Sequence, residues 1–356
     1  MNMVVKIKTA SLNRNKQGQL TVSFENNSDH RVDLYWTEEA NVNTTNKTLI
    51  SKDIKSPFSF EDPLQAKRRI YLILQIDNDS SYLVAERTLP ITGLNNFRDF
   101  GGYIGANGKP VKWGLLYRSN HLHGLKPDAQ QYIKTLNIQT IIDYRCENEI
   151  KTSPNSSIGE KQTFNFDASA QTAELAAQFA ADPSNEDRAL IESVLRDIPK
   201  ELVNGEGIQV LEQYRNFVLS EKSKNAYRQM LRVVLDGNNS PSIQHCRGGK
   251  DRTGYGVLLI QIMLGVSESD IIYDYMLTHD NRLERNKIKM EAYRKITDDE
   301  DVLGYLLSLI DTRESFVLEI LNTMKKVAGT PSNYIKQELG FTDQDFEKMQ
   351  AIYLEA

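Results

Sequence analysis

Cysteine is scarce in this sequence, with only Cys146 and Cys246 among 356 residues. So few cysteines argue against a disulfide framework and favour a reducing compartment. No apolar run approaches the roughly 20 residues that a membrane-spanning helix needs. The start, MNMVVKIKTA, also lacks a hydrophobic stretch long enough for a secretory signal. We therefore expect a cytoplasmic protein without a transmembrane segment, although a secreted chain with its signal removed would look the same.

Excess positive charge and clustered metal ligands are also missing. The net charge of −5 gives no support for a nucleic-acid partner. His121 and His123 alternate, but no acidic or thiol residue stands beside them at a ligand spacing. We expect no metal and no cofactor. What is present is 40% hydrophobic residues, enough for real cores, in a length that suggests about two domains.

Residues 1–88 contain short runs rich in β-branched and aromatic residues, separated by turn clusters. The runs are VVKIKTASL, QLTVSFEN, RVDLYWTE, IYLILQID and SYLVAERTL. This spacing predicts a small all-β domain, resembling a sandwich of the fibronectin or immunoglobulin type. It holds no catalytic constellation, so a packing or stabilising role is favoured over a binding role.

The most informative run is HCRGGKDRTG, residues 245–254. It places a nucleophile, Cys246, before a guanidinium, Arg252, that can grip two phosphate oxygens at once. The glycines between them, Gly248 and Gly249, allow a tight loop whose amide groups form an anion-binding nest. The other loop residues expected to bind substrate are Arg247, Lys250, Thr253 and Gly254.

The flanking residues suit a phosphate site. Residues 241–244 are extended in character, and GYGVLLIQIMLG reads as a buried helix whose N-terminus faces the loop. The loop cations and this helix favour a thiolate at Cys246, and the Thr253 hydroxyl is near enough in sequence to donate to the sulfur. These parts predict hydrolysis of a phosphate monoester through a phosphocysteine, without a metal.

The loop resembles that of the bacterial tyrosine and dual-specificity phosphatases, whose signature is His-Cys-x-x-Gly-Lys-Asp-Arg-Thr-Gly. The similarity covers about residues 88–356 and includes NFRDFGGY, LYRSNHL, TIIDYRCENEI and GTPSNYIKQELGFTDQDFEKMQAIYL. It implies an α/β domain over 89–356, with a parallel sheet surrounded by helices. It also implies that Cys246 is the nucleophile and Arg252 the phosphate binder, assisted by Lys250 and Asp251. Arg247 departs from the small, neutral residue usual at its position.

The general acid is left open by the sequence. Resemblance to phosphoinositide phosphatases of the myotubularin type favours Asp251. The alternatives are Asp143, at the end of the strand-like QTIID, and Asp167, after TFNF. A structural role for Asp143, in holding Arg145, carries equal weight.

Residues 168–237 form a predicted helical insertion before the loop, and we expect it to act as a lid. The reason is that its first helix, rich in alanine, has little apolar surface. The expected activity is a cysteine-dependent phosphatase acting on protein phosphotyrosine. The alternatives are a phosphoinositide phosphatase with the same catalytic residues, which Lys250 and Arg247 favour, and a non-catalytic phosphate-binding module. The sequence does not reveal the oligomeric state.

Overall fold

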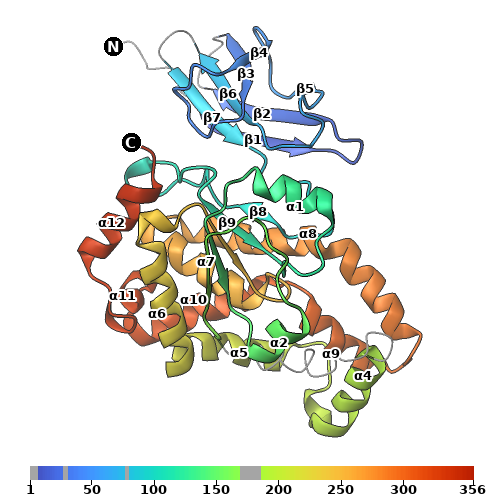
Figure 1. Cartoon of the computed structure of the whole chain (residues 1–356). Helices are drawn as coiled ribbons and strands as arrows, with labels where there is room; N and C mark the ends of the chain where they lie inside the picture. The colour runs from blue at the N-terminus through green and yellow to red at the C-terminus, as the bar shows by residue number, and fades with distance from the viewer. Residues whose placement is uncertain (1–6, 27–30, 77–79, 169–185) are drawn as a thin grey trace.

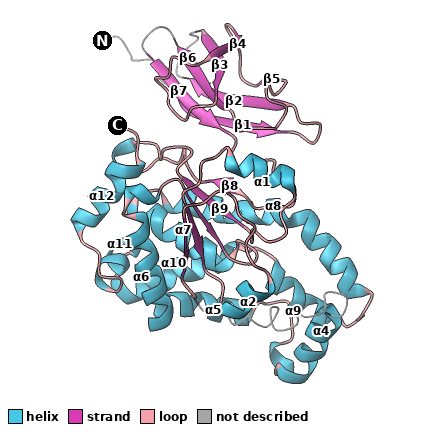
Figure 2. Ribbon diagram, in the orientation of Figure 1, coloured by secondary structure: helices cyan, strands magenta, loops and turns pink. Residues whose placement is uncertain are grey.

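Two parts of different secondary structure make up the molecule. The computed structural model of the chain describes residues 7–26, 31–76, 80–168 and 186–356. The N-terminal strands lie at one end, and the remaining residues form a sheet surrounded by helices (Figure 1). Figure 2 shows the same division, with strands and loops alone in the N-terminal part and helices dominating the rest.

The N-terminal part contains two antiparallel sheets of order β1-β2-β5 and β4-β3-β6-β7. Their strands are β1 (Ile7–Arg14), β2 (Leu20–Asn26), β3 (Val32–Thr37), β4 (Thr48–Ser51), β5 (Phe58–Phe60), β6 (Tyr71–Ile76) and β7 (Ser80–Ala85). Burial alternates on β3, where Val32 and Leu34 are buried and Asp33 and Tyr35 are partly exposed. Inward side chains of both sheets form one apolar core. The expected all-β start of the chain is confirmed.

A five-stranded sheet of order β11-β10-β12-β9-β8 lies at the centre of the second part. Its strands are β8 (Arg98–Asp99), β9 (Leu116–Ser119), β10 (Thr140–Asp143), β11 (Gln162–Asn165) and β12 (Ser242–His245). The strands from β11 to β9 run parallel, and β8 adds an antiparallel edge. The pairing sets His245 between Asp143 and Ser119, so three strands end together. This edge is where ligands bind in open α/β sheets.

Helices surround this sheet, which confirms the predicted α/β class. They are α1 (Pro127–Lys134), α2 (Glu147–Thr152), α4 (Glu186–Asp197), α5 (Ile208–Leu219), α6 (Glu221–Val234), α7 (Asp251–Met263), α8 (Glu268–Arg294), α9 (Glu300–Ile310), α10 (Glu314–Ala328), α11 (Pro331–Gln337) and α12 (Asp343–Tyr353). Every residue of α7 from Arg252 to Met263 is buried, as its apolar sequence predicts. Among the described residues, no helix is both long and apolar enough to cross a membrane.

The predicted helical insertion is present in its described portion as α4, α5 and α6. Residues 169–185, which include the alanine-rich segment on which the lid hypothesis depends, lie outside the described residues. The lid therefore stays a prediction.

Candidate active site

The HCRGGKDRTG run connects the central strand β12 to the buried helix α7. Cys246 directly follows the last residue of β12, and α7 begins at Asp251. The N-terminus of α7 therefore points its positive end at the loop. Within the described residues, the amide groups of residues 248–253 donate to no backbone carbonyl. They remain available to an anion bound in the loop.

Both loop glycines lie close to neighbouring residues, and Gly249 is required by its backbone conformation and its contact with β9. Gly249 has a φ of +66°, and a Cβ there would lie 2.3 Å from the carbonyl oxygen of Ser119. A Cβ on Gly248 would lie 3.0 Å from Nη1 of Arg282. Any larger residue at position 249 would strain the backbone and displace the end of β9.

The loop carbonyls are bound from outside by three side chains. Asn96 donates from Nδ2 to the carbonyls of Gly248 (3.2 Å) and Gly249 (3.1 Å). Arg118 donates to the Gly249 carbonyl at 2.9 Å, and Arg282 to the Gly248 carbonyl at 2.7 Å. A peptide carbonyl and its amide point in opposite directions, so these bonds turn the amides toward the concave side of the loop. None of these three residues is among the site residues predicted from the sequence.

Arg252 is fully buried and is held by Glu149, on α2. The two side chains form a bidentate pair, Nη1 to Oε2 at 2.6 Å and Nη2 to Oε1 at 2.8 Å. Burial alone would lower the pKa of Arg252, but the hydrogen bonds to Glu149 and the proximity of Cys246 raise it above its ordinary value. Nε makes no hydrogen bond within the described chain. The guanidinium therefore stays charged and keeps its Nε edge for a phosphate oxygen.

Glu149 was not predicted as a site residue, although a local signal for it exists. It occupies the third position of α2 and accepts a hydrogen bond from the backbone N–H of Cys146 at 3.0 Å. An acid three residues after a helix cap is typical of a capping box. This pattern indicates a helix start, and only the folded chain shows that the same carboxylate also holds Arg252.

Asp251 has one carboxylate oxygen engaged and the other open. Its Oδ1 accepts a hydrogen bond from the Tyr214 hydroxyl at 2.8 Å and lies 3.3 Å from the Lys250 ammonium. The Tyr214 hydroxyl in turn lies 2.6 Å from that of Tyr275. Oδ2 has no polar partner among the described residues. Among the described residues, other side chains therefore hold only Oδ1 of Asp251 in place.

Asp143 and Asp167, the alternative acids, have different surroundings. Asp143 is buried and bonded to Arg145, at 2.7 Å between Nη2 and Oδ2, and to Asn155 at 3.2 Å. Burial opposes ionisation of Asp143, but the neighbouring His245 and Arg145 hold its pKa below the usual value. Asp167 forms an ion pair with Lys222 at 2.8 Å. Both carboxylates are thus engaged by partners outside the loop.

Lys250 and Thr253 differ from the arrangement that the motif suggests. The buried Lys250 ammonium donates to the carbonyls of Leu309 and Asp311, both at 2.8 Å, so it anchors the loop to the end of α9. Burial lowers its pKa. The Thr253 hydroxyl is buried and makes no hydrogen bond within the described chain, so the expected bond to the Cys246 sulfur is not formed. Gly254 packs closely on Tyr275, because a Cβ on Gly254 would lie 3.2 Å from Cε2 of the Tyr275 ring.

A cavity of about 430 Å³ opens beside the loop. Its wall is rich in cations, namely Arg247, Lys250, Arg282, Arg285 and Lys289, with Asp187 as the only carboxylate among the described lining residues. Burial lowers the pKa of Arg282 to about 10, which leaves it charged at neutral pH. Leu190, Tyr293, Leu309 and Ile310 supply an apolar side. The cavity suits an anion attached to an apolar or aromatic group.

Comparison with known proteins agrees with this geometry. Residues 89–355 match the family described as the tyrosine phosphatase family. A provisionally named tyrosine-protein phosphatase of Cupriavidus necator is 24% identical over 261 residues, 73% of this chain and 86% of the relative. The triple specificity protein phosphatase PtpB of Mycobacterium tuberculosis is 21% identical over 288 residues, 76% of this chain and 100% of the relative. The chain belongs to the tyrosine phosphatase family, and it is a phosphatase.

Proposed function

We propose that the chain hydrolyses phosphate monoesters, above all protein phosphotyrosine, through a phosphocysteine intermediate. The observation that carries this proposal is the loop between β12 and α7. It combines Cys246, inward-turned amides and a buried, charge-paired Arg252 at one helix N-terminus. Preorganised donors of this kind stabilise a transferring phosphoryl group without a metal ion.

The proposed reaction has two steps. The Cys246 thiolate attacks phosphorus, forming the S–P bond, and the P–O bond to the leaving group breaks with its electron pair on oxygen. The proton on Oδ2 of Asp251 passes to that oxygen. Water then attacks phosphorus, the S–P bond breaks to return the thiolate, and Asp251 takes the proton of the water. Asp143 and Asp167 have no part in this scheme because other side chains engage them.

A phosphoinositide is the second candidate substrate, and the cationic cavity wall favours it. Arg282, Arg285 and Lys289 line the cavity beside the loop, where Lys289 is paired with Asp187. A head group with several phosphates could occupy more of these charges. The apolar side of the same cavity, with Leu190 and Tyr293, favours the phenyl ring of phosphotyrosine.

We expect phosphate release from phosphotyrosine peptides to exceed release from phosphoserine and phosphothreonine peptides. A panel that also contains soluble phosphoinositides, assayed by free phosphate at equal concentrations, decides between the candidates. A phosphoinositide turned over with the highest kcat/KM would replace the first candidate with the second. Phosphate binding without turnover of any member would leave the non-catalytic module.

Replacement of Asp251 should have an effect that depends on the leaving group. We expect Asp251→Asn to lower kcat/KM about 10²-fold for phenyl phosphate, because the phenolate then departs without a proton. For a nitrophenyl ester, whose leaving group is already stable as an anion, kcat/KM should change little, because it reports only the steps up to formation of the phosphocysteine. The two substrates are compared at several pH values, with Asp167→Asn as the matched control. Equal losses on both esters, or loss in Asp167→Asn instead, would remove Asp251 as the acid.

A further inference from the structure

The β8–β9 edge of the central sheet makes side-chain contacts on both of its faces. Strands β8 and β9 pair so that Arg98 lies opposite Arg118 and Asp99 lies opposite Tyr117. Opposed residues share a face of a sheet, and successive residues point to opposite faces. One face of this edge therefore carries two arginines, and the other carries an acid and a tyrosine.

The arginine face supports the phosphate loop. Arg118 donates to the Gly249 carbonyl at 2.9 Å and pairs with Asp274 of α8 at 2.8 Å. Arg98 pairs with the same carboxylate at 3.3 Å and donates to Asn96. Asn96 is the residue that binds both loop carbonyls. Every one of these contacts is buried or nearly so, which leaves the loop little freedom while the sheet edge stays in place.

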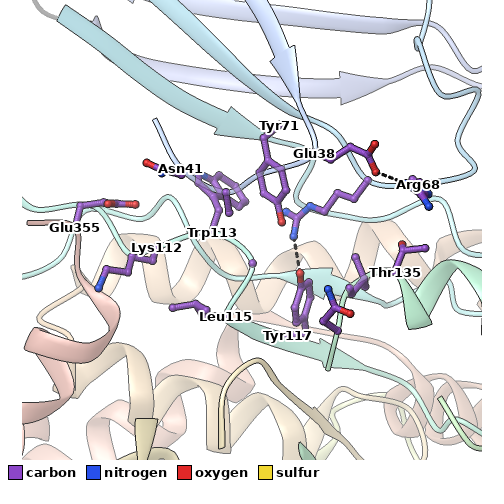
Figure 3. A pocket seen from close by; sticks show the side chains of 15 residues that line it. Glu38, Asn41, Arg68, Tyr71, Lys112, Trp113, Leu115, Tyr117, Thr135 and Glu355 are labelled. Atoms are coloured by element: carbon purple, nitrogen blue, oxygen red, sulfur yellow. Dashed lines mark hydrogen bonds and ion pairs between the residues drawn. The ribbon is translucent and has the colours of Figure 1, made fainter. Parts of the chain in front are cut away.

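The opposite face is held by a residue of the N-terminal part of the chain. Arg69, just before β6, donates from Nη1 to Oδ2 of Asp99 at 2.6 Å and to the Tyr117 hydroxyl at 2.9 Å. Its Nη2 donates to the carbonyl of Glu86 at 3.1 Å. One guanidinium thus bridges the β part to both strands of the edge. Tyr71, Trp113 and Tyr117 lie around this contact, as Figure 3 shows.

The contact between Arg69 and Asp99 is buried. The Arg69 side chain is 3% exposed and the Asp99 side chain 0%. The guanidinium lies over the rings of Tyr71 at 4.7 Å and Tyr117 at 5.6 Å. Asp99 also accepts hydrogen bonds from the backbone N–H groups of Gly101 and Gly114, at 2.7 and 2.6 Å. Removal of the arginine would leave a buried carboxylate without its counter-charge, so the edge would have to shift.

We propose that Arg69 is a positioning residue for the phosphate loop, acting through β8 and β9, so that the N-terminal β part belongs to the catalytic apparatus. The proposal rests on the proposed function for its catalytic consequence. Its direct consequence, a looser phosphate site, does not depend on turnover. Arg69 itself touches neither Cys246 nor Arg252.

The test uses the full-length chain with Arg69→Met, Arg69→Lys and Tyr117→Phe. We expect Arg69→Met to weaken binding of inorganic phosphate, measured by calorimetry, and to lower kcat by about ten- to a hundredfold, since small displacements far from the chemistry have effects of this size. Arg69→Lys keeps the charge and should recover part of the loss. Tyr117→Phe removes one hydroxyl and should have a smaller effect in the same direction.

Two arginines of the same part of the chain serve as matched controls. Arg14 forms a comparable pair with the carboxylates of Asp62 and Glu86, at 2.8 and 2.6 Å, and is linked to Arg69 only through Glu86, whose main-chain carbonyl binds Arg69. Arg68 forms an exposed pair with Glu38 at 2.8 Å, marked in Figure 3. We expect Arg14→Met to lower the melting temperature, while phosphate affinity and kcat stay within about twofold of wild type in both controls.

The outcomes separate the two proposals. Phosphate affinity unchanged in folded Arg69→Met and Arg69→Lys, or lost equally in Arg14→Met, overturns the positioning role. A wild-type chain that binds phosphate but hydrolyses nothing overturns the proposed function instead. In that case the phosphate affinities of the variants still test the role of Arg69.

Discussion

Replacing Cys246 by serine should abolish hydrolysis while substrate still binds. A serine hydroxyl holds its proton far more tightly than a thiol does, so it is a far weaker nucleophile than a thiolate. We expect kcat to fall by roughly 10⁴-fold or more, which is the scale seen when a nucleophile is removed. The loop amides and the Arg252–Glu149 pair are untouched, so a phosphotyrosine peptide should bind with near-normal affinity. Calorimetry and phosphate release on the same samples measure both quantities.

Cys146 provides the matched control for this experiment, as the second of two cysteines. Cys146→Ser should keep full activity, because serine is a good residue at the helix cap that Cys146 occupies on α2. Hydrolysis that survives in Cys246→Ser at more than about a hundredth of the wild-type rate would rule out the phosphocysteine mechanism.

Replacing Arg252 by lysine should produce the second largest loss. Lysine keeps a positive charge but cannot bind Glu149 with two parallel bonds and still present a planar N–H edge to phosphate. We expect kcat/KM to fall about 10²- to 10³-fold, the usual result of losing a transition-state donor. The KM for substrate and the affinity for inorganic phosphate should both worsen, unlike in Cys246→Ser. Steady-state kinetics on a phosphotyrosine peptide provide the measurement.

Glu149→Gln separates the orientation of Arg252 from its charge. This variant retains the Arg252 guanidinium but weakens the two hydrogen bonds that orient it. We therefore expect a smaller loss of kcat/KM, of about tenfold. It also leaves a buried cation without its counter-charge, which typically costs about 3–5 kcal/mol of stability. Activities are therefore compared at a temperature where circular dichroism shows each variant folded.

Near-normal kcat/KM in Arg252→Lys would show that the site uses only the positive charge at this position, and not the planar guanidinium.

The loop could be predicted from the sequence because its ten residues are contiguous. Gly248 and Gly249 predict a tight turn, the apolar run after Arg252 predicts a buried helix, and the structure has α7 there. The strands of the N-terminal residues could also be predicted from the sequence, since burial of one face of a strand imposes a period of two. The α/β class followed from the family resemblance and is confirmed.

The supports of the loop could not be predicted in this way. Glu149 lies 103 residues before Arg252, and Asn96 lies 153 residues before Gly249. The motif also did not reveal where the Lys250 side chain points. Its ammonium donates to carbonyls at the end of α9. Such contacts depend on how whole elements pack, and spacing along the chain carries no information about them.

The sequence by itself determined the residues on which the proposed chemistry depends: Cys246, a glycine-rich turn and Arg252 follow one another within a single loop. Local backbone preferences are enough to specify that arrangement. Only the tertiary structure decided what holds it in place, by bringing Glu149 against Arg252 and Arg69 against the edge of the sheet. The reason is physical: a buried charge is stable only beside its partner, and the partner is chosen by the packing of distant segments.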